Sequence, residues 1–107
     1  MSLADKTCVP CHGGVPKLTR EQFQSLLGEL KDWQVVDDQR LHKVVKTKDF
    51  EKALKLANNV GEIAEEQQHH PDLLVRWGSL TIDLWTHAID GLSEADFILA
   101  AKIDKLL

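Results

Sequence analysis

The sequence has no apolar run near the roughly 20 residues that a membrane-spanning helix needs. Its N-terminus also lacks the apolar core of a secretory signal peptide, so we expect a cytoplasmic protein. Basic residues are fewer than acidic ones, 13 against 17, and the net charge of −4 disfavours nucleic-acid binding, which normally uses a basic surface. Repeats and low-complexity segments are absent. The 107 residues predict one domain, large enough to bury a core without metals or disulfides.

Only two cysteines are present, Cys8 and Cys11, in the segment CVPCH that ends at His12. The C-x-x-C-H pattern can attach haem, but the sole methionine is the first residue and no export signal is evident, which disfavours a cytochrome. Zinc would need a fourth ligand nearby, and a redox C-x-x-C usually opens a helix, whereas glycine and proline follow here. We therefore interpret residues 1–16 as a flexible N-terminal extension and residues 17–107 as the domain.

The rest of the sequence alternates between helical and strand patterns. Thr19 begins a capping box, Asp49 suits the N-cap of a long helix, and Ser93 suits that of the last helix. Because Pro71 disfavours helical conformation at His70, the long helix should end on or before the histidines. The expected helices cover about residues 20–30, 50–67 and 94 onward, and the expected strands cover 33–36, 41–46, 73–77 and 80–85.

This order of elements predicts an α+β fold with a mostly antiparallel sheet. The last helix carries more apolar residues than one core-facing stripe needs, since eight of the eleven residues 97–107 are apolar. We expect a partner subunit to cover its second face. The alternative is a helix that is buried more deeply in its own core.

Three histidines, His69, His70 and His87, form the main candidate site. Glu65 precedes His69 by four residues, so both should share one helix face, where the carboxylate would orient the imidazole. His70 should project differently, and His87 follows the last strand, where loop side chains reach a rim. We interpret the cluster as a proton-transfer site; a three-histidine zinc site and unconnected surface histidines are the alternatives. The remaining histidines, expected to be solvent-exposed, are His12 and His42.

The spacing of these residues resembles the signature of the pterin-4a-carbinolamine dehydratases. The similarity covers about residues 17–107 and extends to the residues around the expected helix starts. The residues that carry the signature are Glu65, His69, His70, Pro71, Trp77, His87 and Asp96.

The resemblance implies an enzyme that dehydrates 4a-hydroxytetrahydropterin to quinonoid dihydropterin and water, in tetrahydrobiopterin recycling, with no metal or organic cofactor. It implies a four-stranded antiparallel sheet with three helices packed on one face, in homodimers or homotetramers. Two alternatives remain, a non-catalytic oligomeric adaptor or transcriptional cofactor of the same fold, and a pterin-related role in molybdopterin metabolism.

The resemblance also implies roles for single residues. His69, His70 and His87 would line the pterin pocket and supply acid/base catalysis and binding, and Glu65 would orient His69. No residue would bind a metal. The residues implied to contact the substrate are Asp72, Trp77 and Thr86.

Three further positions bear on this similarity. Asp96 suits the first turn of the last helix, where it can cap the backbone. Many animal members of the family have an aromatic residue where this chain has Leu73 and an arginine where it has Ala95. These differences leave the histidines intact and affect the expected pocket wall.

Overall fold

The computed structural model describes residues 3–6 and 17–107. The expectations for Cys8, Cys11 and His12 therefore lie outside the described residues. The described helices are α1 (Arg20–Leu27), α2 (Phe50–Gln67) and α3 (Glu94–Asp104), with short 3-10 turns η1 (Leu3–Asp5) and η2 (His87–Ile89). The strands are β1 (Gln34–Val36), β2 (Arg40–Lys46), β3 (Asp72–Arg76) and β4 (Ser79–Leu84).

The helices begin where local capping signals predict. Thr19 and Gln22 form the reciprocal capping box of α1, and the Asp49 carboxylate accepts a hydrogen bond from the Lys52 N–H at 2.9 Å at the start of α2. Helix α1 ends at Leu27, earlier than predicted, because the residues after it form tight turns rather than another helical turn. Helix α2 ends before the histidines, as predicted.

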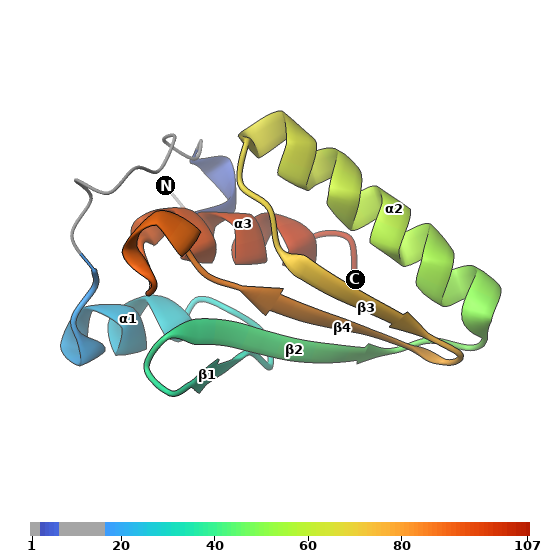
Figure 1. Cartoon of the computed structure of the whole chain (residues 1–107), viewed down its shortest axis with the longest axis horizontal. Coiled ribbons are helices and arrows are strands. Elements are labelled where there is room, and N and C mark those ends of the chain that lie inside the picture. The colour runs from blue at the N-terminus through green and yellow to red at the C-terminus, as the bar shows by residue number, and fades with distance from the viewer. Residues whose placement is uncertain (1–2, 7–16) are drawn as a thin grey trace.

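The four strands form one antiparallel sheet in the order β1-β2-β4-β3. Alternating residues point to the helices: Leu80, Ile82 and Leu84 of β4 are fully buried, whereas the residues between them are partly exposed. In Figure 1, α2 and α3 run along the same side of the sheet, and both α2 and α3 contribute buried residues to the core. The predicted α+β fold with three helices and a four-stranded antiparallel sheet is confirmed.

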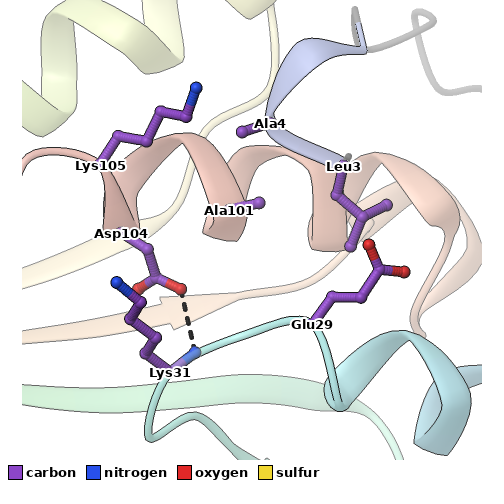
Figure 2. A pocket seen from close by; sticks show the side chains of 7 residues that line it. All are labelled: Leu3, Ala4, Glu29, Lys31, Ala101, Asp104 and Lys105. Atoms are coloured by element: carbon purple, nitrogen blue, oxygen red, sulfur yellow. Dashed lines mark hydrogen bonds between the residues drawn. The ribbon is translucent and has the colours of Figure 1, made fainter. Parts of the chain in front are cut away.

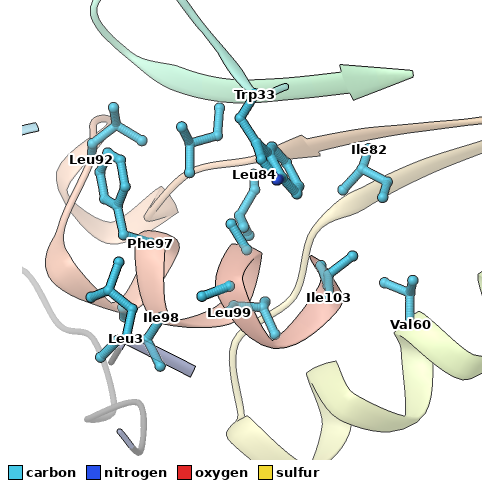
Figure 3. Close-up of a cluster of buried hydrophobic side chains, with 14 of the residues drawn as sticks. Leu3, Trp33, Val60, Ile82, Leu84, Leu92, Phe97, Ile98, Leu99 and Ile103 are labelled. Atoms are coloured by element: carbon cyan, nitrogen blue, oxygen red, sulfur yellow. The ribbon is translucent and has the colours of Figure 1, made fainter. Parts of the chain in front are cut away.

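Helix α3 lies at the centre of the hydrophobic core (Figure 3), and nine of its eleven residues are buried. Its second face is covered within the chain, because η1 packs on it: Leu3 is 2% exposed in the core cluster. The Lys102 ammonium also donates a hydrogen bond to the Ala4 carbonyl at 2.9 Å. The prediction that a partner subunit covers α3 is thus wrong for the described helix. Leu3, which lies in the expected N-terminal extension, packs into the core. None of the described helices is long and apolar enough to cross a membrane.

A buried polar cluster joins the end of α3 to the sheet. The Asp104 carboxylate accepts hydrogen bonds from Trp33 Nε1 at 2.9 Å, from Lys43 Nζ at 3.1 Å and from the Lys31 backbone N–H at 3.1 Å. Lys43 lies within strand β2 and faces inward, and its ammonium also donates to the Lys31 carbonyl at 2.5 Å. All the charged and polar groups of this cluster therefore have partners, as burial requires.

Candidate functional site

His69 is placed by the turn that ends α2. Gln68 adopts a left-handed conformation with φ of 55°, and its N–H bonds back to the last turn of the helix. The chain then leaves the helix axis, and the His69 side chain enters the protein, where the residue is 8% exposed. Its Nε2 lies 2.5 Å from Oδ1 of Asp96, 27 residues further along the chain.

Asp96 is fully buried in the first turn of α3. Its Oδ2 accepts hydrogen bonds from the Ser93 backbone N–H at 2.9 Å and from the Thr86 hydroxyl at 2.8 Å. The first of these confirms the predicted helix-capping role, and a carboxylate in the first turn is also favoured by the helix dipole. The same side chain therefore caps α3 with one oxygen and holds His69 with the other.

His70 is paired with Glu65 through its Nε2, and both side chains are largely exposed. The prediction that Glu65 orients His69 is therefore wrong. It assumed that helical geometry continues to His69, whereas the left-handed Gln68 turns the chain after Gln67. The residue that the carboxylate reaches is His70, five positions away instead of four.

His87 approaches the other two histidines from the segment after β4. It begins η2, it is exposed, and its ring packs against Trp85 with the ring centroids 4.4 Å apart. An isolated bridge between Thr86 and Gly91 closes this segment into a compact loop. All three predicted histidines thus converge on one pocket of about 270 Å³. The residues that line it are Gln68, His69, His70, Thr86, His87 and Ala88.

Of the three residues that the resemblance assigns to substrate contact, only one lines the histidine pocket. Thr86 lines the pocket but is 1% exposed, with its hydroxyl bonded to Asp96 and 2.7 Å from the Ser93 hydroxyl. Asp72 begins β3 on the face of the sheet away from the helices and is not among the lining residues. Trp77 follows the far end of β3, about 16 Å from its start by the rise of an extended strand, and is 76% exposed. The structure does not bring Trp77 to the histidines.

His42 differs from its sequence expectation. It is half-buried on β2, and its Nδ1 lies 2.7 Å from Oδ1 of Asp83 on the neighbouring strand. Arg40 donates to the same oxygen at 3.2 Å. The expectation of a solvent-exposed His42 is wrong, because cross-strand partners are set by the sheet register and not by proximity in sequence.

In the described ranges 3–6 and 17–107, no group of three or more histidine, cysteine or carboxylate side chains is arranged to hold a metal ion. The three-histidine zinc alternative is therefore not supported by this geometry. A second pocket, of about 220 Å³, lies between η1, α3 and the segment after α1 (Figure 2). It has no histidine, and its one buried carboxylate, Asp104, is already bonded within the fold. Of these two pockets, the one lined by the three histidines is therefore the one suited to proton transfer.

The fold and the pocket together define a small α+β protein in which three histidines line one pocket. The family model described as pterin 4 alpha carbinolamine dehydratase matches residues 16–106. A protein of Rubrobacter xylanophilus is 50% identical over 104 residues, covering 97% of both chains, and one of Rickettsia bellii is 49% identical over 106 residues, covering 98% of this chain and 94% of that one. Both are provisionally named pterin-4-alpha-carbinolamine dehydratases.

A solved structure agrees with these sequence matches. The transcriptional coactivator/pterin dehydratase of Brucella melitensis superposes with a TM-score of 0.79 at 28% identity, over 85% of this chain and 98% of that one. The chain belongs to the pterin-4a-carbinolamine dehydratase family.

Proposed function

We propose that the protein catalyses the dehydration of 4a-hydroxytetrahydropterin to quinonoid dihydropterin and water, as a hydro-lyase. The observation that carries the proposal is the convergence of three histidines on one pocket, two of them paired with carboxylates. The reaction breaks the C4a–O bond, removes the proton from N5 and adds a proton to the departing hydroxyl. Imidazoles suit both transfers, because their ordinary pKa lies near neutral pH.

The imidazole rings of the three histidines lie in different environments. His69 is held inside the protein by Asp96, whereas His70 and His87 are exposed and can meet a substrate from the open side. In the proposed site, His69, His70 and His87 contact the pterin and exchange protons with it, and Glu65 orients His70. Thr86 borders the pocket floor, and Asp72 would lie near the mouth.

The decay of freshly generated 4a-hydroxytetrahydropterin, followed by stopped-flow ultraviolet absorbance, tests this function. We expect the protein to accelerate the decay, and His69→Ala or His87→Ala to lower the rate by on the order of 10²-fold or more, the size of a general acid/base contribution. His42→Ala is the matched control, since His42 is also paired with a carboxylate but lies outside the pocket. An unaccelerated decay would disprove the dehydratase function and leave the two alternatives, the non-catalytic adaptor and the pterin-related role in molybdopterin metabolism. Undiminished turnover in both pocket variants would disprove the site.

We also propose that the protein is a homo-oligomer. The support within the chain is a set of large apolar side chains that the monomer leaves about half exposed. Two of them, Phe50 and Leu54, lie one turn apart on α2 and face the same way. Exposed apolar surface at this spacing is typical of a helix that packs against another subunit.

A further inference from the structure

The two oxygens of the Asp96 carboxylate have different tasks. Oδ2 accepts the Ser93 N–H and the Thr86 hydroxyl, whereas Oδ1 faces only Nε2 of His69. All four residues of this network are buried, with exposed fractions of 8% for His69, 3% for Ser93, 1% for Thr86 and 0% for Asp96. The geometry of this hydrogen-bond network is therefore set by the surrounding protein and not by solvent.

This arrangement decides where His69 carries its proton. An ionised carboxylate only accepts hydrogen bonds, so the ring nitrogen that contacts Oδ1 must be the donor. The neutral ring then has its proton on Nε2 and its lone pair on Nδ1. Nδ1 takes no hydrogen bond from the described residues, and among them no buried polar side-chain atom lacks a partner. Nδ1 is consequently open to the pocket that His69 lines.

We propose that Asp96, itself held by Thr86, is a positioning residue that keeps His69 in the Nε2–H tautomer and so presents Nδ1 to the substrate as a proton acceptor. The inference rests on the proposed dehydratase function for its catalytic meaning, but the tautomer is a property of the protein alone. It gives Thr86 a different task from the substrate contact implied by resemblance. The Thr86 hydroxyl donates to Asp96 and so fixes the carboxylate that fixes the ring.

Asp96→Asn is the most direct test, because it replaces the oxygen that faces His69 with an amide nitrogen. The other oxygen, which accepts the hydrogen bonds from Ser93 and Thr86, can stay in place. The amide oxygen can still accept the Ser93 N–H and the Thr86 hydroxyl, while the amide nitrogen takes the place of Oδ1. An amide N–H donates, so Nε2 of His69 would have to accept and the proton would move to Nδ1. The lone pair would then point at the amide and not into the pocket.

Long-range proton–nitrogen NMR correlation spectra of the isotopically labelled protein report this tautomer directly. At a pH where the ring is neutral, we expect the Nε2–H form of His69 in the unmodified protein and the Nδ1–H form in Asp96→Asn, with His42 unchanged as an internal reference. His69→Gln identifies the signal by its disappearance. A neutral Nδ1–H ring in the unmodified protein, or the same tautomer in both proteins, would overturn the proposal.

Thr86→Val and Thr86→Ser form the matched pair for the second contact. Valine keeps the shape and removes the hydroxyl, so the carboxylate loses one of its donors and we expect the rate constant kcat to fall by about tenfold with KM changing less. Serine restores the donor and should restore kcat. Equal kcat values for the two variants would show that the hydroxyl does not act through Asp96.

The kinetic outcomes separate this inference from the proposed function. Asp96→Asn should lower kcat by on the order of 10²-fold or more while the variant stays folded by circular dichroism. An unmodified protein without dehydratase activity refutes the proposed function but leaves the NMR result decisive for the tautomer. An active protein whose Asp96→Asn variant keeps both its rate and its His69 tautomer refutes the positioning role alone.

Discussion

At the scale of single residues, burial separates ion pairs that look alike in sequence. The Lys43–Asp104 pair has side chains that are 9% and 8% exposed, whereas the Arg20–Asp38 pair is 67% and 54% exposed. Removing one member of a buried pair leaves an uncompensated charge, but water replaces a lost partner at the surface. The hydrogen bond and charge of Asp38 also raise the pKa of Arg20 above its ordinary value.

We expect Asp104→Ala to lower the free energy of unfolding by about 3–5 kcal/mol, because Lys43 and the Trp33 N–H would lose their buried acceptor. Asp38→Ala is the control and should cost at most about 1 kcal/mol. Urea unfolding followed by tryptophan fluorescence measures both. Equal losses in the two variants would show that the buried cluster contributes no more than a surface pair.

At the scale of elements, the end of α2 decides the geometry of the site. The αL conformation of Gln68 turns His69 inward, and residues other than glycine and asparagine adopt this conformation at a cost, because their Cβ crowds the backbone. The Gln68 side chain offsets part of this cost by donating to the Glu65 carbonyl at 3.0 Å. A residue that resists a positive φ should therefore disturb both stability and the pocket.

Gln68→Val should destabilise the protein by about 1–2 kcal/mol, since a β-branched residue strongly disfavours the left-handed region. The same change should lower dehydratase turnover, because His69 follows directly. Gln68→Gly adopts a positive φ without strain and should keep both near their original values. Thermal unfolding and the stopped-flow assay test this together. A valine variant as stable and active as the glycine variant would contradict the role given to this turn.

The 3-10 turn η1 is the second element whose packing matters, since it covers α3. Leu3→Ala should cost about 2–5 kcal/mol of unfolding free energy, the range for truncating a buried leucine to alanine. Leu107→Ala is the matched control, because Leu107 is 52% exposed. Chemical denaturation distinguishes them. If Leu3→Ala were as harmless as the control, η1 would not contribute to the stability of the core.

At the scale of the whole molecule, the monomer buries a hydrophobic core but leaves several large apolar side chains exposed on its surface. Helix α3 is buried among η1, α2 and the sheet, so the proposed assembly does not need it as an interface. The half-exposed Phe50 and Leu54 on α2 are the better candidates. The proposed interface would bury surface near the start of α2, whereas Gln68, His69 and His70 of the histidine pocket follow the other end of that helix.

Light scattering coupled to size-exclusion chromatography should give a mass above the 12.1 kDa of one chain. Leu54→Glu should shift the protein towards the monomer, because a charge replaces apolar surface in the proposed interface. Lys55→Glu changes the charge at the neighbouring position and serves as the control. A monomeric unmodified protein would contradict the proposed oligomer, and an oligomer unaffected by Leu54→Glu would place the interface elsewhere.

The sequence by itself determined the features that depend on near neighbours. The capping boxes at Thr19 and Ser93 act over three residues, and Pro71 restricts only the residue before it, so the helix starts and the end of α2 were predictable. Alternation along β4 likewise predicted which face is buried. The similarity of residue spacing then indicated the family and its three histidines.

Tertiary structure alone decided which groups meet. His69 pairs with Asp96, which lies 27 residues further along the chain. The helical spacing of Glu65 and His69 gave the wrong pairing, because the positive φ of Gln68 redirects the chain before His69. The cover of α3 by η1 likewise joins the two ends of the sequence. Such contacts depend on how whole elements pack against one another, and the free energy of that packing is not encoded in any short window of residues.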